Sequence, residues 1–173
     1  MSSEIVAYVA VSLDGYIAGE GGTVDFLEDF GSDEYDFHGF FDSLGAVVMG
    51  STTYEQVLGW GWPYGETPGL VLTTRDLAVA EGATIEFSAE PTGDAIRAYA
   101  STTDKRLWIV GGGRVILDAL HAGTVELLEL YVMPVVLGAG IPLFPGEFSG
   151  TLTLIESTAF SNGVVRLRYR PAV

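Results

Sequence analysis

The chain has 173 residues, of which 48% are hydrophobic and 18% charged. Such a composition is typical of one folded domain with a sizeable core and argues against wholesale disorder, so we expect a single domain over residues 1–173. The net charge is −15, and no Lys or Arg precedes Arg75. A nucleic-acid partner requires a basic stripe that displaces phosphate counterions. We therefore expect no nucleic-acid partner.

Residue types that are missing exclude further classes. The chain has no cysteine, which rules out disulfides, thiol catalysis and Cys-based zinc sites. Its two histidines, His38 and His121, fall on helical patterns, so we expect no metal. The N-terminal stretch MSSEIVAYVAVS lacks a basic region, and no apolar run approaches 18 residues. We expect neither a signal peptide nor a membrane span, and a cytoplasmic location.

The elements expected in the first two thirds of the chain alternate between strand and helix. Apolar runs predict strands at 4–11, 46–50, 69–74, 83–87 and 106–110. Phe37, Phe40, Phe41 and Leu44 have the spacing of a core stripe on a helix over 33–44. Further helices are expected from Ser51, from Pro91–Asp94, and from Arg114 to a stop at Gly123.

The last third changes character, with strand-like runs at 125–138, 151–160 and 163–170 separated by turns. Alternating strands and helices followed by strands alone predict an α/β fold: a mostly parallel sheet with helices on both faces, finished by antiparallel C-terminal strands. In such sheets ligands bind at the carboxyl ends of the parallel strands. Three of these ends carry useful chemistry.

The first strand end is VVMGSTTYE (47–55). Gly50 permits a tight turn, and Ser51, Thr52 and Thr53 place hydroxyls at a helix N-terminus, which favours an anion. The alternative is that Ser51 or Thr52 only caps the helix, with Glu55 completing a capping box.

The second strand end is VLTTRDL (71–77). Thr73, Thr74 and Arg75 offer two hydroxyls and the first guanidinium of the chain. Arg75 is suited to bidentate pairing with a phosphate, and equally to a salt bridge with Asp76 or a distant carboxylate.

The third strand end is VGGGRVI (110–116). Gly111 and Gly113 fit the start of a G-x-G-x-x-G pattern, but position 116 is isoleucine and the motif follows a late strand. A Rossmann dinucleotide site is therefore not expected. Three adjacent glycines indicate close approach of the backbone to a ligand, or else a purely structural bend.

The order of motifs resembles the dihydrofolate reductase-like superfamily, and most closely its branch related to the C-terminal reductase domain of the bacterial bifunctional riboflavin-biosynthesis enzyme. The matching stretches are AVSLDGYIAG (10–19), VVMGSTTYEQ (47–56), LTTR (72–75), LWIVGGGRVI (107–116), LYVMPVVLGAGIPLF (130–144) and NGVVRLRYR (162–170). The resemblance implies a three-layer α/β/α fold, NADPH as hydride donor, and a small heterocyclic or sugar-derived substrate, as for 5-amino-6-(5-phosphoribosylamino)uracil reductase or dihydrofolate reductase.

The resemblance also implies positions for the two ligands. The glycines would hold the cofactor pyrophosphate, Thr74 and Arg75 would lie near the ribose 2′-phosphate, and Ala10 and Ile17 beside the nicotinamide. The full set implied for the cofactor is Ala10, Ile17, Gly50, Ser51, Thr52, Thr53, Thr74, Arg75, Val110, Gly111, Gly112, Gly113, Arg114 and Val115. The set for the substrate is Phe26, Trp62, Gly138 and Leu143.

Two departures from the family pattern bear on specificity. Ser51 replaces an arginine that commonly assists recognition of the 2′-phosphate, so Arg75 must act alone, Arg114 must help, or the preference for NADPH over NADH weakens. The first 74 residues also offer no basic group for a phosphorylated substrate, so we expect a neutral or cationic one.

Reduction also requires a proton, and Asp25 in GGTVDFLED is our candidate donor, with a solvated acid or helix cap as the alternative. Asp14 in SLDG is expected to form a turn. Trp62, with Trp60, is suited to wall a flat heterocycle or to pack between subunits, and we expect a homodimer. The competing functional hypothesis is a nucleotide-binding protein of the same fold with little or no turnover.

Overall fold

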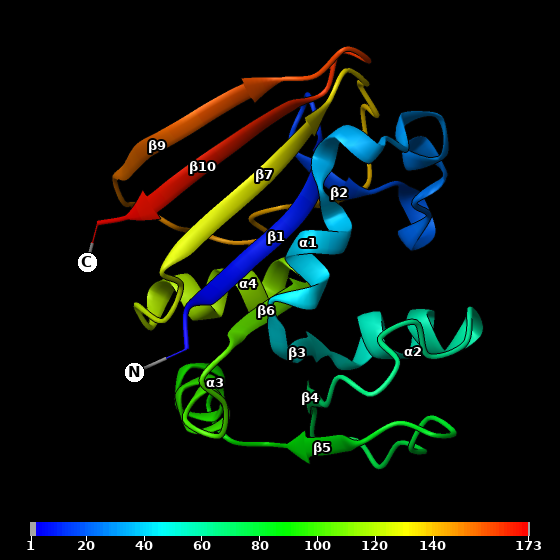
Figure 1. The fold of residues 1–173 in the computed structure, drawn as a ribbon, viewed down its shortest axis with the longest axis vertical. Helices are drawn as coiled ribbons and strands as arrows, with labels where there is room; N and C mark the ends of the chain where they lie inside the picture. Colours follow the sequence, from blue (N-terminus) through cyan, green and yellow to red (C-terminus); the bar gives the residue numbers. More distant parts are fainter. Residues whose placement is uncertain (1–2, 173) are drawn as a thin grey trace.

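A computed structural model describes residues 3–172, in which eight strands form the main sheet in the order β5-β4-β3-β6-β1-β7-β10-β9 (Figure 1). The parallel strands are β1 (Ile5–Ser12), β3 (Leu44–Gly50), β4 (Gly69–Leu72), β5 (Ile85–Ser88), β6 (Arg106–Gly111) and β7 (Leu127–Met133). The strand β10 (Val165–Pro171) runs antiparallel to β7, and β9 (Leu152–Ala159) antiparallel to β10. The expected mostly parallel sheet with antiparallel C-terminal strands is confirmed.

Helices cover both faces of the sheet and make the three layers. The helices α3 (Thr92–Ala100) and α4 (Gly113–His121) share one core with Ile5 and Ala7 of β1. The helices α1 (Phe37–Asp42) and α2 (Ser51–Gly59) share another with Val6 of the same strand. Successive residues of a strand point to opposite faces, so a central strand buried on both sides is apolar throughout, as the run in β1 indicated.

The helix predicted over 33–44 is wrong in its length. Residues Asp33–Tyr35 form a 3-10 turn, Asp36 is left-handed with φ 52°, and α1 begins only at Phe37. The Asp36 carboxylate accepts a hydrogen bond from the Gly39 N–H at 3.3 Å, so this residue caps α1 rather than continuing a helix through it. At the other end, Leu44 already belongs to β3.

A small second sheet was not expected from the sequence. It pairs β2 (Tyr16–Ala18) with β8 (Ile141–Pro142), and in the predicted strand 125–138 the regular structure ends at Met133. Between β2 and α1, Glu20–Gly22 and Asp25–Phe30 form further 3-10 turns. The two-stranded sheet therefore ties the chain after β1 to the chain after β7.

Two kinds of feature are absent from the residues that the structure describes. Over residues 3–172, no helix has the length and apolar character needed to cross a membrane. In the same residues, no three His, Cys, Asp or Glu side chains gather in a way that could hold a metal ion.

Because the sheet is covered by helices on both faces, truncating a leucine on a central strand should lower the free energy of unfolding. Leu128 on β7 is 0% exposed, whereas Leu154 on the edge strand β9 is 51% exposed. We expect Leu128→Ala to lower the free energy of unfolding by about 2–5 kcal/mol, because it leaves a cavity in a close-packed core. Urea unfolding measures this, with Leu154→Ala as the matched control that should lose less than about 1 kcal/mol. Equal losses in both variants would contradict the assigned layers.

Candidate functional site

The three strand ends identified in the sequence lie side by side. The sheet places β3 between β4 and β6, with Met49 opposite Gly111 and Gly50 opposite Leu72. All three strands are parallel, so their carboxyl ends share one edge of the sheet. The predicted grouping of hydroxyls, one arginine and a glycine run at this edge is confirmed.

The glycines of the run have different roles. Gly112 has φ 89°, and a Cβ there would meet the Thr53 Oγ1 at 3.4 Å and the Val115 Cγ2 at 3.8 Å. Gly113 starts α4, and its Cβ would lie 2.6 Å from the Pro142 carbonyl oxygen, so this residue is required by packing. Gly111 has φ 156° and no neighbour within 4 Å of a Cβ. The structural-bend interpretation therefore applies to Gly113, while Gly111 and Gly112 leave open space beside the backbone.

The hydroxyls at the start of α2 do not cap it. The N-cap is Gly50, no side chain accepts a hydrogen bond at the cap, and Glu55 does not close a capping box. The capping interpretation is wrong because Ser51 and Thr52 are already the first two residues of α2, whereas the N-cap is the residue that precedes the helix. The first N–H groups of α2 thus have no side-chain cap, and the Thr53 hydroxyl lies beside Gly112. The helix α4 likewise has a glycine, Gly112, at its N-cap and no side-chain cap.

The two helix starts are in contact. A Cβ on Gly50 would lie 3.2 Å from the Val115 Cγ2, and the same methyl is the second neighbour of Gly112. Two helix N-termini without side-chain caps therefore lie next to each other at this edge. Such an arrangement suits a polyphosphate better than a single cap does, because both dipoles act on the same charge.

Arg75 is held by a carboxylate. Its Nη1 and Nη2 donate to the Glu55 Oε2 and Oε1 at 2.8 and 2.6 Å, and its backbone N–H donates to the Thr73 hydroxyl. The hydrogen bonds from Arg75 hold the pKa of Glu55 below its ordinary value. The salt-bridge interpretation of Arg75 is confirmed, with Glu55 as the distant partner. Thr74 is exposed beside it.

Asp14 joins the turn after β1 to the loop after β7. Its Oδ1 accepts from the Ser12 hydroxyl at 2.7 Å and the Leu137 N–H at 3.0 Å, and its Oδ2 accepts from the Gly138 N–H at 2.7 Å. The hydrogen bond from Ser12, followed by those from the two backbone N–H groups, lowers the pKa of Asp14. Asp14 is therefore a turn residue, as expected, and it also fixes the position of the segment 137–144.

The residues implied for the nicotinamide and the substrate are distributed around this junction. Ala10 and Phe26 pack with Tyr131 and Met133 on the face of β7 that α1 covers. Ile17 and Leu143 pack on the opposite face, against the core of α3 and α4. These side chains thus flank β1 from both faces of the sheet.

Two further candidates lie elsewhere. Asp25 is exposed at the start of the 3-10 turn Asp25–Phe30. Trp62 packs edge-on against Tyr54 and Tyr64, with ring centroids 6.2 and 4.8 Å away, and covers Gly69 of β4. Trp62 is therefore a part of the core beneath α2.

A polar cavity of about 240 Å³ lies on the α1 face and was missed by the sequence reasoning. It is lined by Tyr35, Asp36, Gly39, Phe40, Arg106, Glu129, Tyr131, Arg166 and Arg168. Three arginines from the second half of the chain thus meet α1, which belongs to the 74 residues without Lys or Arg. The available signal was the period-two alternation of polar residues in LELYVMP and VRLRY, which places Glu129 with Tyr131 and Arg166 with Arg168.

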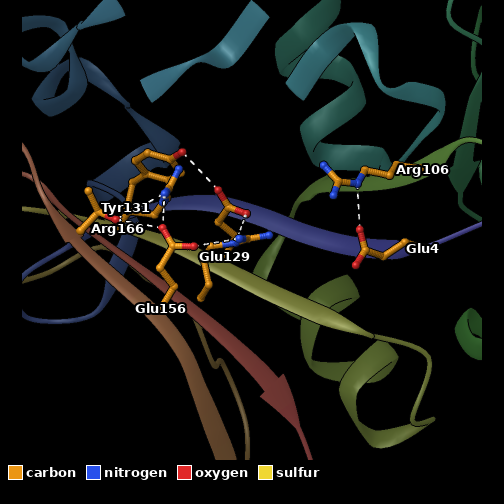
Figure 2. A network of polar contacts seen from close by, with 8 residues as sticks. Glu4, Arg106, Glu129, Tyr131, Glu156 and Arg166 are labelled. Carbon is orange, nitrogen blue, oxygen red and sulfur yellow. Dashed lines mark hydrogen bonds and ion pairs between the residues drawn. The ribbon is translucent and has the colours of Figure 1, made fainter. Parts of the chain in front are cut away.

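The charges lining this cavity are paired. Figure 2 shows Glu129, Glu156, Arg166 and Tyr131 converging, while Glu4 and Arg106 form a separate pair at 2.8 Å. Arg168 bridges Glu129 at 3.2 Å and Glu156 at 3.0 Å. Arg166 donates to the other oxygen of Glu156 at 2.5 Å. Burial raises the pKa of Tyr131, so its hydroxyl stays protonated and donates to Glu129. The cavity is polar without an excess of positive charge.

Comparison with known proteins gives a consistent picture. The sequence matches the RibD C-terminal domain family over residues 3–166. It is 31% identical to YwjB of Bacillus subtilis (strain 168), an uncharacterized protein, over 98% of both chains. A Shewanella sp. PV-4 structure assigned to riboflavin biosynthesis superposes with a TM-score of 0.82 at 25% identity, covering 100% of each chain. Dihydrofolate reductase from Enterococcus faecalis, complexed with NADP(H), gives 0.70 at 18% identity over 98% and 97%. The fold is that of RibD-type and dihydrofolate reductase-like reductases.

The hydrogen bonds to Asp14 predict a pH-dependent stability. Because the folded-state pKa is depressed, this carboxylate stabilises the fold above its unfolded value of about 3.9, and the contribution is lost as pH falls through the folded-state pKa. We expect Asp14→Asn to lower the urea midpoint at about pH 7, and the gap from wild type to narrow below about pH 4. Asp104→Asn, at an exposed turn, is the control. A gap that stays constant with pH would contradict the assigned cause.

Proposed function

The chain belongs to the RibD C-terminal domain family, and we propose that it is an NAD(P)H-dependent reductase of a small heterocyclic or sugar-derived substrate. The observation that supports this most directly is the edge formed by Gly111, Gly112 and the start of α2. Two helix N-termini there lack side-chain caps and face open space beside a glycine backbone. A dinucleotide pyrophosphate fits this combination of dipoles and free N–H groups.

The residues of this edge fit the cofactor by their chemistry. The backbone N–H groups of residues 111–115 and the Thr53 hydroxyl would donate to the pyrophosphate. Ser51 and Thr52 would add hydroxyls where the helix dipole favours an anion. The position of Gly112 is decisive, because a side chain there would occupy the space beside Thr53.

A bound dihydronicotinamide would supply the hydride. The chain's own residues would bind the cofactor, orient it against the substrate and exclude water. Ala10 and Ile17 would lie beside the nicotinamide ring. Phe26, Gly138 and Leu143 would bound the substrate, with the segment 137–144 held in place by Asp14. Asp25 would deliver the proton. A homodimer remains a prediction.

The substrate we propose carries little net charge. The cavity near α1 contains Arg106, Arg166 and Arg168, but each guanidinium is already paired with a glutamate. A phosphorylated substrate would place its negative charge beside glutamates that already balance these guanidiniums, whereas a neutral heterocycle can exchange hydrogen bonds with Tyr131 and Glu129 without adding charge.

The competing proposal is a nucleotide-binding protein of this fold with little turnover. The replacement by Ser51 and the exposed position of Asp25 favour it. Cofactor binding followed by oxidation of NADH or NADPH with a panel of pterins, pyrimidines and small carbonyls separates the two. Tight binding without oxidation across that panel would support the binding protein.

Substitution of the glycine edge tests the cofactor site. We expect Gly112→Val to weaken NADH and NADPH binding at least about tenfold, because a branched side chain at positive φ fills the space beside Thr53 and strains the backbone. Tryptophan fluorescence titration measures it. Gly82→Val, also at positive φ (75°) but in the turn before β5, is the matched control and should bind normally. Thr53→Val keeps the shape and removes one donor, so it should weaken binding without affecting the fold. Unchanged binding in both edge variants would refute the site.

A second substitution tests the proton donor. We expect Asp25→Asn to lower kcat at least about tenfold while the cofactor Kd stays the same, because general acid catalysis contributes about 10²–10⁴ in rate. Asp29→Asn in the same 3-10 turn is the control. The measurement is NAD(P)H oxidation with whichever panel compound is reduced. Equal rates in the two variants would exclude Asp25 as donor.

A further inference from the structure

The pair formed by Glu55 and Arg75 crosses the carboxyl edge of the sheet. Glu55 lies one turn into α2, and Arg75 follows β4. Each terminal nitrogen of the guanidinium donates to one carboxylate oxygen, the Nη1 to Oε2 at 2.8 Å and the Nη2 to Oε1 at 2.6 Å. The Thr73 hydroxyl accepts from the Arg75 N–H at 2.9 Å and orders the turn that directs the side chain toward α2. Bidentate geometry with an ordered backbone distinguishes this pair from ordinary surface ion pairs.

The Glu55–Arg75 pair lies along the same edge of the sheet as the proposed pyrophosphate site. The sheet runs β6, β3, β4, and these strands carry in turn the glycine run, the start of α2, and Arg75. A dinucleotide with its pyrophosphate at Gly112 and Thr53 and its nicotinamide near β1, as proposed above, would have its adenosine half on the β4 side of this line. In nucleotide-binding α/β folds, the choice between a ribose 2′-hydroxyl and a 2′-phosphate is made by an acid or an arginine at such a strand end.

Within residues 3–172, the cations at this edge are already paired with carboxylates. The sequence has no Lys or Arg before Arg75, and α2 itself contains none. Arg114 at the start of α4 is paired with Asp118 at 3.0 Å. Of the remaining cations, Lys105 and Arg106 lie at the opposite edge, where β6 begins, and Arg97 lies on α3. Arg166, Arg168 and Arg170 lie on β10. Arg75 and Arg114 are thus the cations of this edge, and each has a carboxylate partner.

We propose that Glu55 is a specificity-determining residue: by holding Arg75, it lets the site take NADH about as tightly as NADPH. This inference rests on the proposed cofactor site. A 2′-phosphate must either pull Arg75 away from Glu55 or lie beside the carboxylate, and both offset the attraction of the guanidinium. A free 2′-hydroxyl neither separates Arg75 from Glu55 nor brings a negative charge beside the carboxylate, and it can donate a hydrogen bond to Glu55.

The test is fluorescence titration with NADH and with NADPH for four forms of the intact protein. In the wild type, we expect NADPH to bind no more than about threefold tighter than NADH. Glu55→Gln frees Arg75 and should shift the ratio toward NADPH by about tenfold, which equals about 1.4 kcal/mol. In the Glu55→Gln/Arg75→Gln double variant, the ratio should return to the wild-type value, because the freed cation is gone. The shift in Glu55→Gln should shrink in high salt, as expected of a contact between exposed charges.

Glu4→Gln is the matched control. This substitution also removes one carboxylate from a glutamate–arginine pair, that of Glu4 with Arg106 at 2.8 Å, but at the opposite edge of the sheet. Its cofactor ratio should equal that of the wild type, which excludes a general effect of net charge.

The outcomes separate this inference from the proposed function. Wild-type preference for NADPH above about threefold, or a Glu55→Gln shift below about threefold, overturns the role of Glu55 while leaving the cofactor site standing. Failure of both nucleotides to bind overturns the cofactor site and this inference together.

Discussion

Parallel pairing of β3 with β4 and β6 is the constraint on which the rest of the structure depends. It aligns Met49 with Gly111 and Gly50 with Leu72, so three turns that are distant in sequence share one edge. The start of α2 and the start of α4 then face each other across a glycine backbone. Neither helix start has a side-chain cap, so its first N–H groups are available as hydrogen-bond donors.

A second consequence is the division of charge. The first 74 residues, which contain no Lys or Arg, supply α1, α2 and the 3-10 turns, whereas these cations come from Arg75 onward. Folding brings the two parts together in pairs such as Glu4 with Arg106 and Glu55 with Arg75. The Glu129–Arg168–Glu156–Arg166 network also joins β7, β10 and β9. Arginines that the composition presents as candidate anion ligands are therefore largely occupied by carboxylates.

Hydrogen bonds to backbone groups join the turn after β1 to the segment after β7. Asp14 accepts hydrogen bonds from Leu137 and Gly138, and the Leu143 N–H donates to the Gly15 carbonyl at 2.9 Å. Gly113 is required because a side chain would strike the Pro142 carbonyl oxygen. The segment after β7 is thus fixed against both the turn after β1 and the start of α4. A change in this segment affects both sides of the site.

The sequence by itself determined the alternation of strands and helices, the antiparallel tail, the stop of α4 at Gly123 and the three chemically useful strand ends. These features are local: apolar periodicity, turn chemistry and glycine positions act over a few residues. Only the tertiary structure decided that Gly50 caps α2, that Arg75 is paired with Glu55, and that Arg166 and Arg168 meet Tyr35 and Asp36 in one cavity. The pairing of Arg75 and the cavity depend on which side chains from remote segments come close together, and that follows from strand order and register, which no local pattern encodes.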